Sequence, residues 1–161
     1  MTDAPLEARI GDRLKTLKLT LAVAESCTGG MLGARLTSVP GSTAYFRGGV
    51  IAYANEVKIR LLNVAADVLA EHGAVSEAVA QSMAEGVRIA LNADVGIGIT
   101  GVAGPDGGTP DKPVGRVCIG LADRQRSEAR AYNFPGDRTA VRRAACQAAL
   151  EQLADRLGRL A

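Results

Sequence analysis

The spacing of apolar positions along the chain switches between two periods, and this alternation predicts a layered α/β fold. Residues 5–17 carry apolar side chains every three or four positions, which is typical of an amphipathic helix. The apolar run 19–24 that follows is short and uninterrupted, as in a strand buried on both faces. Helical spacing then resumes at Met31 and stops before Pro40. The first part of the chain therefore predicts a helix, a strand, a turn and a second helix.

The rest of the chain shows the same two patterns. The predicted strands cover residues 19–24, 48–55, 94–100, 114–122 and 129–134. The predicted helices cover residues 5–17, 31–39, 56–62, 65–71, 77–91 and 138–160. Asn55, Ser76 and Asp137 each stand immediately before a predicted helix, where their side chains are expected to act as N-caps.

The connections between the strands predict the topology of the sheet. Helices join the first three strands, so these strands are expected to be parallel. The polar stretch 123–128 is typical of a hairpin turn, which predicts that the last two strands are antiparallel. Glycines within 94–100 indicate close approach of another backbone or a ligand. We expect an α/β fold, a three-layer α/β/α sandwich with a mixed, mostly parallel five-stranded sheet, in a single domain over residues 1–161.

Composition and charge narrow the classes of function. With 47% hydrophobic and 22% charged residues, the chain is typical of a soluble globular protein. It has no apolar run long enough to span a membrane and no N-terminal signal pattern, so a cytoplasmic location and no membrane partner are expected. The net charge of +2, the 3% aromatic content and the lack of Trp argue against a nucleic-acid partner.

Cysteine and histidine usage restricts the chemistry further. The three cysteines, Cys27, Cys118 and Cys146, are far apart and match neither a disulfide framework nor a metal site, so no metal or other cofactor is expected. The single histidine, His72, stands where a helix is expected to end, a common place for a partner of the helix dipole. We therefore expect any nucleophile in this chain to use a base other than histidine.

The first predicted strand ends in a short polar turn with the sequence Glu25-Ser26-Cys27-Thr28-Gly29-Gly30. Open α/β sheets bind ligands at the carboxyl ends of their strands, where this turn is expected to lie. The first N–H groups of the following helix have no partner within it, so they can hold an anion or an oxyanion. The alternative is a Ser or Thr N-cap with glycines that serve only packing.

Lys58 is the candidate base for Ser26. It is predicted in the first turn of a helix, where the positive end of the dipole opposes a cation. This position, with burial near the sheet edge, favours a neutral amine that can act as the base of a Ser-Lys pair. Tyr53 lies two residues before the expected end of the second strand and could point to the same rim. The alternatives are a solvated lysine and a tyrosine packed in the core.

A second glycine-rich loop, Thr100 to Pro105, begins at the carboxyl end of the third predicted strand. Its backbone N–H groups could hold a phosphate or an oxyanion, and the alternative is a tight structural turn. Arg138, Arg142 and Arg143 crowd the start of the last predicted helix. One of them could reach a phosphate, and the alternative is a solvated basic face.

Four separated motifs stand in order over nearly the whole chain, from about Leu6 to Leu157. They are Ala24-Glu25-Ser26-Cys27-Thr28-Gly29-Gly30, Gly48-Gly49-Val50-Ile51-Ala52-Tyr53-Ala54-Asn55 with Lys58, Gly98-Ile99-Thr100-Gly101-Val102-Ala103-Gly104-Pro105, and Phe134-Pro135-Gly136-Asp137-Arg138. Together they resemble the CinA C-terminal domain, the nicotinamide-nucleotide amidohydrolase family. Larger members of that family carry a further N-terminal domain, so the chain is expected to be the stand-alone form.

The resemblance implies a hydrolase of pyridine-nucleotide recycling that deamidates nicotinamide mononucleotide to nicotinate mononucleotide and ammonia. By motif position, Ser26 would be the nucleophile, Lys58 its base and Tyr53 an assisting or orienting residue. Backbone N–H groups after Ser26 would stabilise the oxyanion, and the loop 100–105 would hold the ribose phosphate end. The residues expected to bind this small-molecule nucleotide are Cys27, Thr28, Gly29, Gly30, Asn55, Thr100, Gly101, Ala103, Gly104 and Arg142.

Two other functions stay open at this point. The chain could be a non-catalytic nucleotide-binding or interaction module with the same fold. Alternatively, Cys27 could act as a redox or nucleophilic thiol whose pKa is depressed at a helix N-terminus. A homo-oligomer is expected for a small enzyme of this class.

Overall fold

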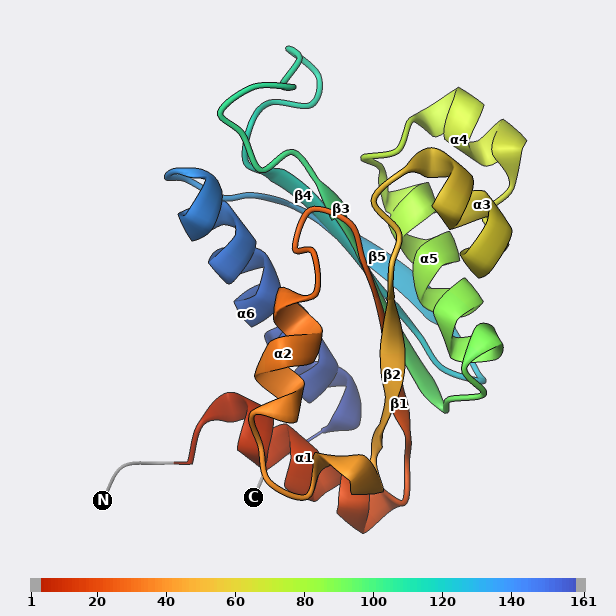
Figure 1. Ribbon diagram of the computed structural model, residues 1–161, viewed down its shortest axis with the longest axis vertical. Coiled ribbons are helices and arrows are strands. Elements are labelled where there is room, and N and C mark those ends of the chain that lie inside the picture. Colours follow the sequence, from red (N-terminus) through yellow and green to blue (C-terminus); the bar gives the residue numbers. More distant parts are fainter. Residues whose placement is uncertain (1–3, 159–161) are drawn as a thin grey trace.

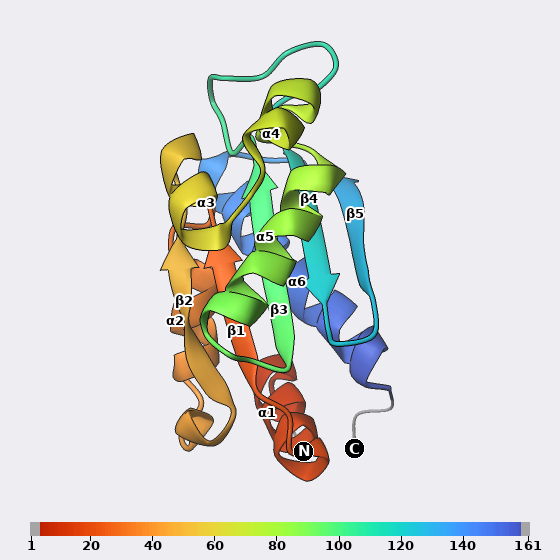
Figure 2. The ribbon, with the colours of Figure 1, turned by 90° about the vertical axis from the view of Figure 1, so that its right-hand side faces the viewer.

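The computed structural model describes residues 4–158 and contains one five-stranded sheet between two layers of helices (Figure 1). The strands are β1 (Leu21–Glu25), β2 (Phe46–Ile51), β3 (Val95–Gly101), β4 (Arg116–Ala122) and β5 (Ser127–Asn133). Their order across the sheet is β2-β1-β3-β4-β5, which can be followed in Figure 2. The central strands β1 and β3 are buried along almost their whole length, as their apolar runs predict.

Helices cover both faces of the sheet (Figure 1). On one face lie α1 (Leu6–Leu17), α2 (Met31–Thr37) and α6 (Arg138–Leu157). On the other lie α3 (Asn55–Leu62), α4 (Ala66–His72) and α5 (Glu77–Ala90), and a short 3-10 helix, η1 (Ser42–Ala44), precedes β2. This arrangement agrees with the expected α/β/α layers. No helix within residues 4–158 is both long and apolar enough to cross a membrane.

The first three strands are parallel, as predicted, but the sheet as a whole is not mostly parallel. β1 pairs in parallel with β2 and with β3, whereas β4 pairs antiparallel with β3 and with β5. Two of the four pairings are therefore antiparallel, and the prediction of a mostly parallel sheet is wrong. The reason is the segment between β3 and β4, which contains no helix to carry a parallel crossover. The predicted hairpin between β4 and β5 is confirmed.

The second strand and the helix after it differ in their boundaries from the prediction. β2 ends at Ile51 rather than at Asn55, and Asn55 is the first residue of α3 rather than its N-cap. The carbonyl oxygens of Ala52 and Tyr53, predicted to lie in the strand, instead accept hydrogen bonds from the Lys58 side chain. The segment between β2 and α3 thus places the Lys58 side chain at the end of the sheet.

Most other boundaries agree with the sequence patterns to within one or two residues. Two of the predicted N-caps are confirmed, because Ser76 and Asp137 accept hydrogen bonds at 3.2 and 2.9 Å from the backbone of the helices they precede. α6 ends at Leu157. The predicted end of this helix at Leu160 lies outside the described residues.

Helix α5 packs closely against the sheet because β3 and β4 present glycines beneath it. A Cβ atom placed on Gly98 would lie 2.7 Å from the backbone nitrogen of Ala84 and 2.8 Å from Cβ of Met83. Gly96 and Gly120 are crowded in the same way by backbone atoms of α5. The close approach predicted from the glycines of β3 is therefore confirmed, and the approaching backbone is that of α5.

Replacing Gly98 with alanine should destabilise the fold. The added methyl group has no room against α5, and overpacking of this kind costs about 1–3 kcal/mol. Urea unfolding should show a lower midpoint with an unchanged slope. Gly33→Ala is the control, because a Cβ atom there lies 3.5 Å from its nearest neighbour and alanine favours a helix. Equal midpoints for the two variants would contradict the prediction.

Candidate active site

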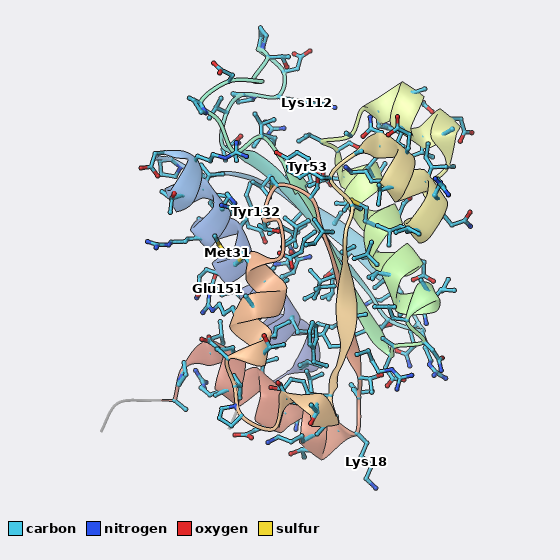
Figure 3. All side chains as sticks on the ribbon, in the orientation of Figure 1. Lys18, Met31, Tyr53, Lys112, Tyr132 and Glu151 are labelled. Carbon is cyan, nitrogen blue, oxygen red and sulfur yellow. The ribbon has the colours of Figure 1, made fainter. Side chains whose placement is uncertain are left out.

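A cavity of about 220 Å³ lies at the carboxyl ends of β1 and β3, where open α/β sheets bind ligands. Figure 3 shows Tyr53 at this end of the sheet and Lys18 at the opposite end. The residues that line the cavity are Ser26, Cys27, Tyr53, Asn55, Lys58, Ala74, Val75, Thr100, Gly101, Ala103 and Arg138. They come from segments that are far apart in the sequence, and only the fold brings them together.

Ser26 is the first residue after β1 and lines the cavity. Its backbone N–H donates to the carbonyl oxygen of Ile99 in β3 at 2.9 Å, which extends the strand pairing by one residue. Its own carbonyl oxygen accepts from the N–H of Gly29 at 3.1 Å, which closes a tight turn. Gly29 and Gly30 adopt φ angles of 58° and 101°, which favour glycine. The backbone of the serine is thus held from both sides.

Lys58 reaches Ser26 from α3 and is only 1% exposed. Its Nζ atom lies 3.2 Å from Ser26 Oγ, and it donates to the carbonyl oxygens of Ala52 at 2.8 Å and of Tyr53 at 3.1 Å. Carbonyl oxygens can only accept, and a neutral amine has two N–H groups. An ammonium would also donate to Ser26 Oγ, whereas in the neutral form the two N–H groups serve the carbonyls and the nitrogen lone pair is left for the hydroxyl of Ser26. This is the arrangement that a general base requires.

The surroundings of Lys58 disfavour its charged form. Burial lowers the pKa of the amine because a cation loses its hydration there, and only a Cys27 thiolate would act in the opposite direction. No carboxylate of residues 4–158 lies within salt-bridge distance of this amine. Lys58 also stands in the first turn of α3, as predicted, where the helix dipole opposes a cation. These effects favour the neutral amine that was expected.

Cys27 lies beside Ser26 but is poorly suited to act as a thiolate. It is 6% exposed, and burial raises the pKa of its thiol to about 11. The expectation of a pKa depressed by the helix N-terminus is therefore wrong.

The N-terminus of α2 is not free to bind an anion, contrary to the expectation from sequence. Glu25, the last residue of β1, accepts at Oε1 from the N–H of Leu32 at 2.8 Å and at Oε2 from the N–H of Gly33 at 3.0 Å. The N–H of Met31 donates to the carbonyl oxygen of Thr28 at 3.0 Å. The first three N–H groups of the helix are therefore all occupied. Sequence reasoning missed Glu25 because the usual capping residue directly precedes its helix.

In the turn after β1, the carbonyl oxygens of residues 26–28 already accept hydrogen bonds, whereas two of the backbone N–H groups of these residues do not donate to another described residue. Arg142 of α6 donates from Nε to the carbonyl oxygen of Cys27 and from Nη2 to that of Thr28, both at 3.0 Å. Since the carbonyl oxygen of Ser26 accepts from Gly29, all three carbonyls have donors. By contrast, the N–H groups of Cys27 and Thr28 have no hydrogen-bond acceptor in another residue of 4–158. Free backbone amides beside a nucleophile are what an oxyanion hole requires.

Some residues predicted to bind the substrate are not among those that line the cavity. They are Thr28, Gly29, Gly30, Gly104 and Arg142. The Thr28 hydroxyl is buried without a partner among the described residues, and the Arg142 guanidinium is occupied by the turn. Thr100 does line the cavity, but its hydroxyl donates to the carbonyl oxygen of Ala74 at 2.8 Å. The contacts of Arg142 and Thr100 thus hold the walls of the site together.

Arg138 lines the cavity in the place expected for Arg142. From the first position of α6 it donates to the carbonyl oxygen of Gly104 at 2.7 Å and to the Tyr53 hydroxyl at 3.3 Å. Tyr53 is 62% exposed, and its hydroxyl bonds to Arg138 and not to Ser26. The signals for Arg138 were its place in the crowded group of arginines and its position at the end of the fourth motif. Residues 74–75 were missed because small apolar side chains carry no chemical signal.

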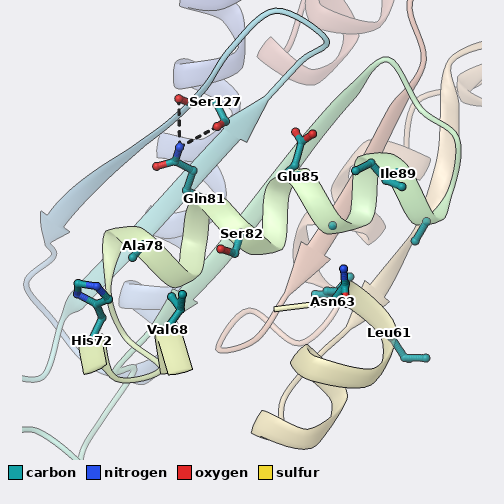
Figure 4. A pocket seen from close by; sticks show the side chains of 13 residues that line it. Leu61, Asn63, Val68, His72, Ala78, Gln81, Ser82, Glu85, Ile89 and Ser127 are labelled. Carbon is teal, nitrogen blue, oxygen red and sulfur yellow. Dashed lines mark hydrogen bonds between the residues drawn. The ribbon is translucent and has the colours of Figure 1, made fainter. Parts of the chain in front are cut away.

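A second, larger groove of about 530 Å³ lies along α5, beside α3 and α4 (Figure 4). Gln81 donates to the Ser127 hydroxyl there at 2.7 Å. His72 and Ser82 line the same groove, but within the described part of the chain no hydrogen bond joins them. Among the residues that line this groove no hydroxyl or thiol is hydrogen-bonded to a lysine or a histidine, whereas in the cavity at the strand ends Lys58 Nζ contacts Ser26 Oγ. Residues 4–158 also contain no group of three or more side chains that could hold a metal ion.

The family model described as the CinA C-terminal domain matches residues 3–157 of the chain. The chain belongs to the CinA C-terminal domain family. Its relatives include a CinA-like protein of Gemmatimonas aurantiaca, 59% identical over 135 residues, and one of Salinibacter ruber, 53% identical over 150 residues. These alignments cover 84% and 93% of the chain but 32% and 36% of the relatives. The chain therefore spans about a third of the length of these curated relatives.

Solved structures of the CinA superfamily share this fold. A competence-damaged protein (CinA) superfamily protein from Klebsiella pneumoniae superposes with a TM-score of 0.91 at 38% identity, over 94% of this chain and 95% of that one. The competence/damage inducible protein CihA from Agrobacterium tumefaciens superposes with a TM-score of 0.88 at 34% identity, over 99% and 100% of the two chains. The family resemblance drawn from the four motifs is therefore confirmed.

The lowered pKa of Lys58 leads to a prediction about the reactivity of Ser26. Only the neutral amine can accept the serine proton, so labelling of Ser26 by a fluorophosphonate should speed up with pH and level off once Lys58 is deprotonated. The midpoint should lie below the usual lysine value of about 10.4. Mass spectrometry of the labelled protein gives the rate, and Lys58→Met should lower it by roughly 100-fold. A midpoint at or above the usual value would contradict this prediction.

Proposed function

We propose that this protein is an amidohydrolase that deamidates nicotinamide mononucleotide to nicotinate mononucleotide and ammonia, with Ser26 as nucleophile and Lys58 as base. The observation that carries the proposal is the 3.2 Å contact between the buried Lys58 Nζ and Ser26 Oγ. A serine hydroxyl becomes an effective nucleophile when a positioned base accepts its proton. The choice of substrate rests on the resemblance to the nicotinamide-nucleotide amidohydrolase family.

The first half-reaction would transfer the acyl group to the enzyme. Lys58 accepts the proton of the Ser26 hydroxyl while Oγ forms a bond to the amide carbon of the substrate. The carbonyl oxygen then carries the negative charge and receives hydrogen bonds from the N–H groups of Cys27 and Thr28, each commonly worth a few kcal/mol. The Lys58 ammonium returns its proton to the amide nitrogen, the carbon–nitrogen bond breaks, and ammonia leaves.

The second half-reaction would release the acid. Lys58, neutral again, accepts a proton from a water molecule that attacks the carbonyl carbon of the acyl-enzyme. The tetrahedral intermediate uses the same two amide groups. Collapse breaks the bond between the carbon and Ser26 Oγ, and the proton on Lys58 returns to Oγ. The products are nicotinate mononucleotide and the free enzyme.

The size of the cavity supports a nucleotide that enters with its amide-bearing ring first. Its volume of about 220 Å³ is below the roughly 300–1,000 Å³ of pockets that enclose whole ligands of drug size. The nicotinamide ring would therefore occupy the cavity, and the ribose and phosphate would remain at its rim. Arg138 bonds there to Tyr53 and to Gly104 in the loop after β3, and a guanidinium can bind a phosphate with two parallel hydrogen bonds. We therefore propose that Arg138 binds the phosphate of the nucleotide.

The wild-type protein should release ammonia from nicotinamide mononucleotide, measured by a coupled ammonia assay. Ser26→Ala and Lys58→Met should each lower kcat by at least about 100-fold, because one removes the nucleophile and the other the base. Cys27→Ala removes the thiol but keeps the backbone N–H, so retained activity in this variant would exclude Cys27 as the nucleophile. Calorimetric binding of the nucleotide without ammonia release by the wild type would instead favour the non-catalytic module.

Arg138→Gln should weaken the use of the nucleotide far more than the use of the nucleoside. A charge-assisted hydrogen bond contributes about 1.5–3 kcal/mol, so kcat/KM for nicotinamide mononucleotide should fall by about 10- to 100-fold. The value for nicotinamide riboside, which has no phosphate, should change little. Arg143→Gln on the same helix does not line the cavity and is the matched control. Equal losses of kcat/KM for both substrates would show that Arg138 does not bind the phosphate.

A further inference from the structure

Glu25 is a buried carboxylate next to the nucleophile that no step of the proposed reaction uses. It is 2% exposed and is not among the residues that line the cavity, so it does not touch the substrate. Both of its oxygens accept hydrogen bonds from backbone N–H groups of α2, seven and eight residues further along the chain. Burying a charged group costs free energy of folding unless the group is hydrogen-bonded. The two backbone contacts offset this cost for Glu25, but they do not by themselves say why a carboxylate is buried here.

Part of the explanation is the missing cap of α2. The N-cap residue is Gly30, which has no side chain to accept a hydrogen bond. Glu25 supplies the acceptors from the end of β1 instead, and its negative charge lies at the positive end of the helix dipole. One side chain thus joins the end of the central strand to the start of the helix that follows. Residues 26–30 form the loop between these two fixed points.

The backbone of Glu25 makes a second connection, toward the base. Its carbonyl oxygen accepts from the N–H of Ala52 at 2.8 Å. The carbonyl oxygen of Ala52 in turn accepts from Lys58 Nζ at 2.8 Å. Glu25 is therefore bonded through its side chain to the helix that closes the Ser26 turn, and through its backbone to the residue that orients Lys58.

We propose that Glu25 is a positioning residue: its carboxylate, clamped on the N-terminus of α2, holds the Ser26 turn in the geometry in which Oγ meets Lys58. This inference rests on the proposed role of Ser26 as nucleophile but not on the identity of the substrate. Glutamine in this place has one oxygen and one NH₂ group, so it can accept only one of the two bonds and opposes the second N–H with a donor. Aspartate keeps the charge but is one methylene shorter.

The test compares Glu25→Gln and Glu25→Asp with the wild type by labelling of Ser26 with a fluorophosphonate. In this reaction Oγ forms a bond to phosphorus, fluoride leaves, and Lys58 takes the serine proton. The amplitude of labelling reports the fraction of folded sites, and the rate constant reports how well Ser26 is placed. We expect Glu25→Gln to lower the rate constant by about tenfold or more at nearly full amplitude, and to lower kcat for the nucleotide with little change in KM.

Glu7→Gln is the matched control. Glu7 also binds α2, through Arg35 at 2.9 Å, but it lies far from the turn in the chain. Its loss should lower the unfolding midpoint in urea without changing the labelling rate constant. If Glu25→Gln does not fold, Glu25→Asp takes its place and should show the same slower labelling.

Two outcomes would overturn the inference. One is a wild-type labelling rate constant in a folded Glu25 variant, even if that variant is less stable. The other is an equal loss of rate in Glu7→Gln, which would make the effect a general loosening of α2. If the wild type is labelled at Ser26 but releases no ammonia, the proposed substrate is wrong and the comparison of the Glu25 variants still holds. A wild type that does neither would overturn both proposals.

Discussion

The site depends on one constraint, the burial of the Lys58 amine without a carboxylate to pair with. Burying an unpaired ammonium costs several kcal/mol, so the protein favours the neutral amine. A neutral amine needs acceptors for its two N–H groups, and the carbonyl oxygens of Ala52 and Tyr53 supply them. The lone pair is then left for Ser26. The local path of the chain between β2 and α3 follows from this requirement, because those two carbonyls must face the amine.

The hydrogen bonds of the turn after β1 determine which of its backbone groups are free. The carbonyl oxygens of Ser26, Cys27 and Thr28 accept hydrogen bonds from Gly29 and Arg142. The first N–H groups of α2 donate to Glu25 and to the carbonyl oxygen of Thr28. Within the described residues, the N–H groups of Cys27, Thr28 and Gly30 remain free, and the first two directly follow Ser26. The free N–H groups of such a turn can stabilise negative charge on a substrate oxygen. Its hydrogen-bonded carbonyl oxygens are directed at their donors and do not face that charge. The hydrogen bonds made elsewhere in the turn therefore decide which groups face the reaction.

Close packing of α5 against the sheet places these parts together. The glycines of β3 and β4 let the helix backbone approach, so the connection from α4 to α5 reaches the cavity at residues 74–75. The chain enters that connection from α4, which follows α3, the helix that carries Lys58. The order of the central strands then sets Ser26 and Thr100 side by side at the carboxyl ends of β1 and β3. The small residues of the core thus serve the geometry of the site as well as its packing.

The sequence by itself determined the elements, their order and the candidates for the nucleophile and the base, Ser26 and Lys58. Periodicity is a local property, and the single histidine at a helix end directed attention to Lys58. The same local signals located the caps Ser76 and Asp137, which precede their helices directly. The family resemblance supplied a substrate, which no spacing could.

Only the tertiary structure decided the direction of β4, the partner of Tyr53 and the tasks of Arg142 and Glu25. Arg142 and Cys27 are bonded across 115 positions of the sequence, and no local pattern records such a pair. Glu25 occupies a strand end yet caps a helix, because the backbone folds back between them. These outcomes depend on how rigid elements meet in space, and a side chain takes the partner that packing brings within hydrogen-bond distance.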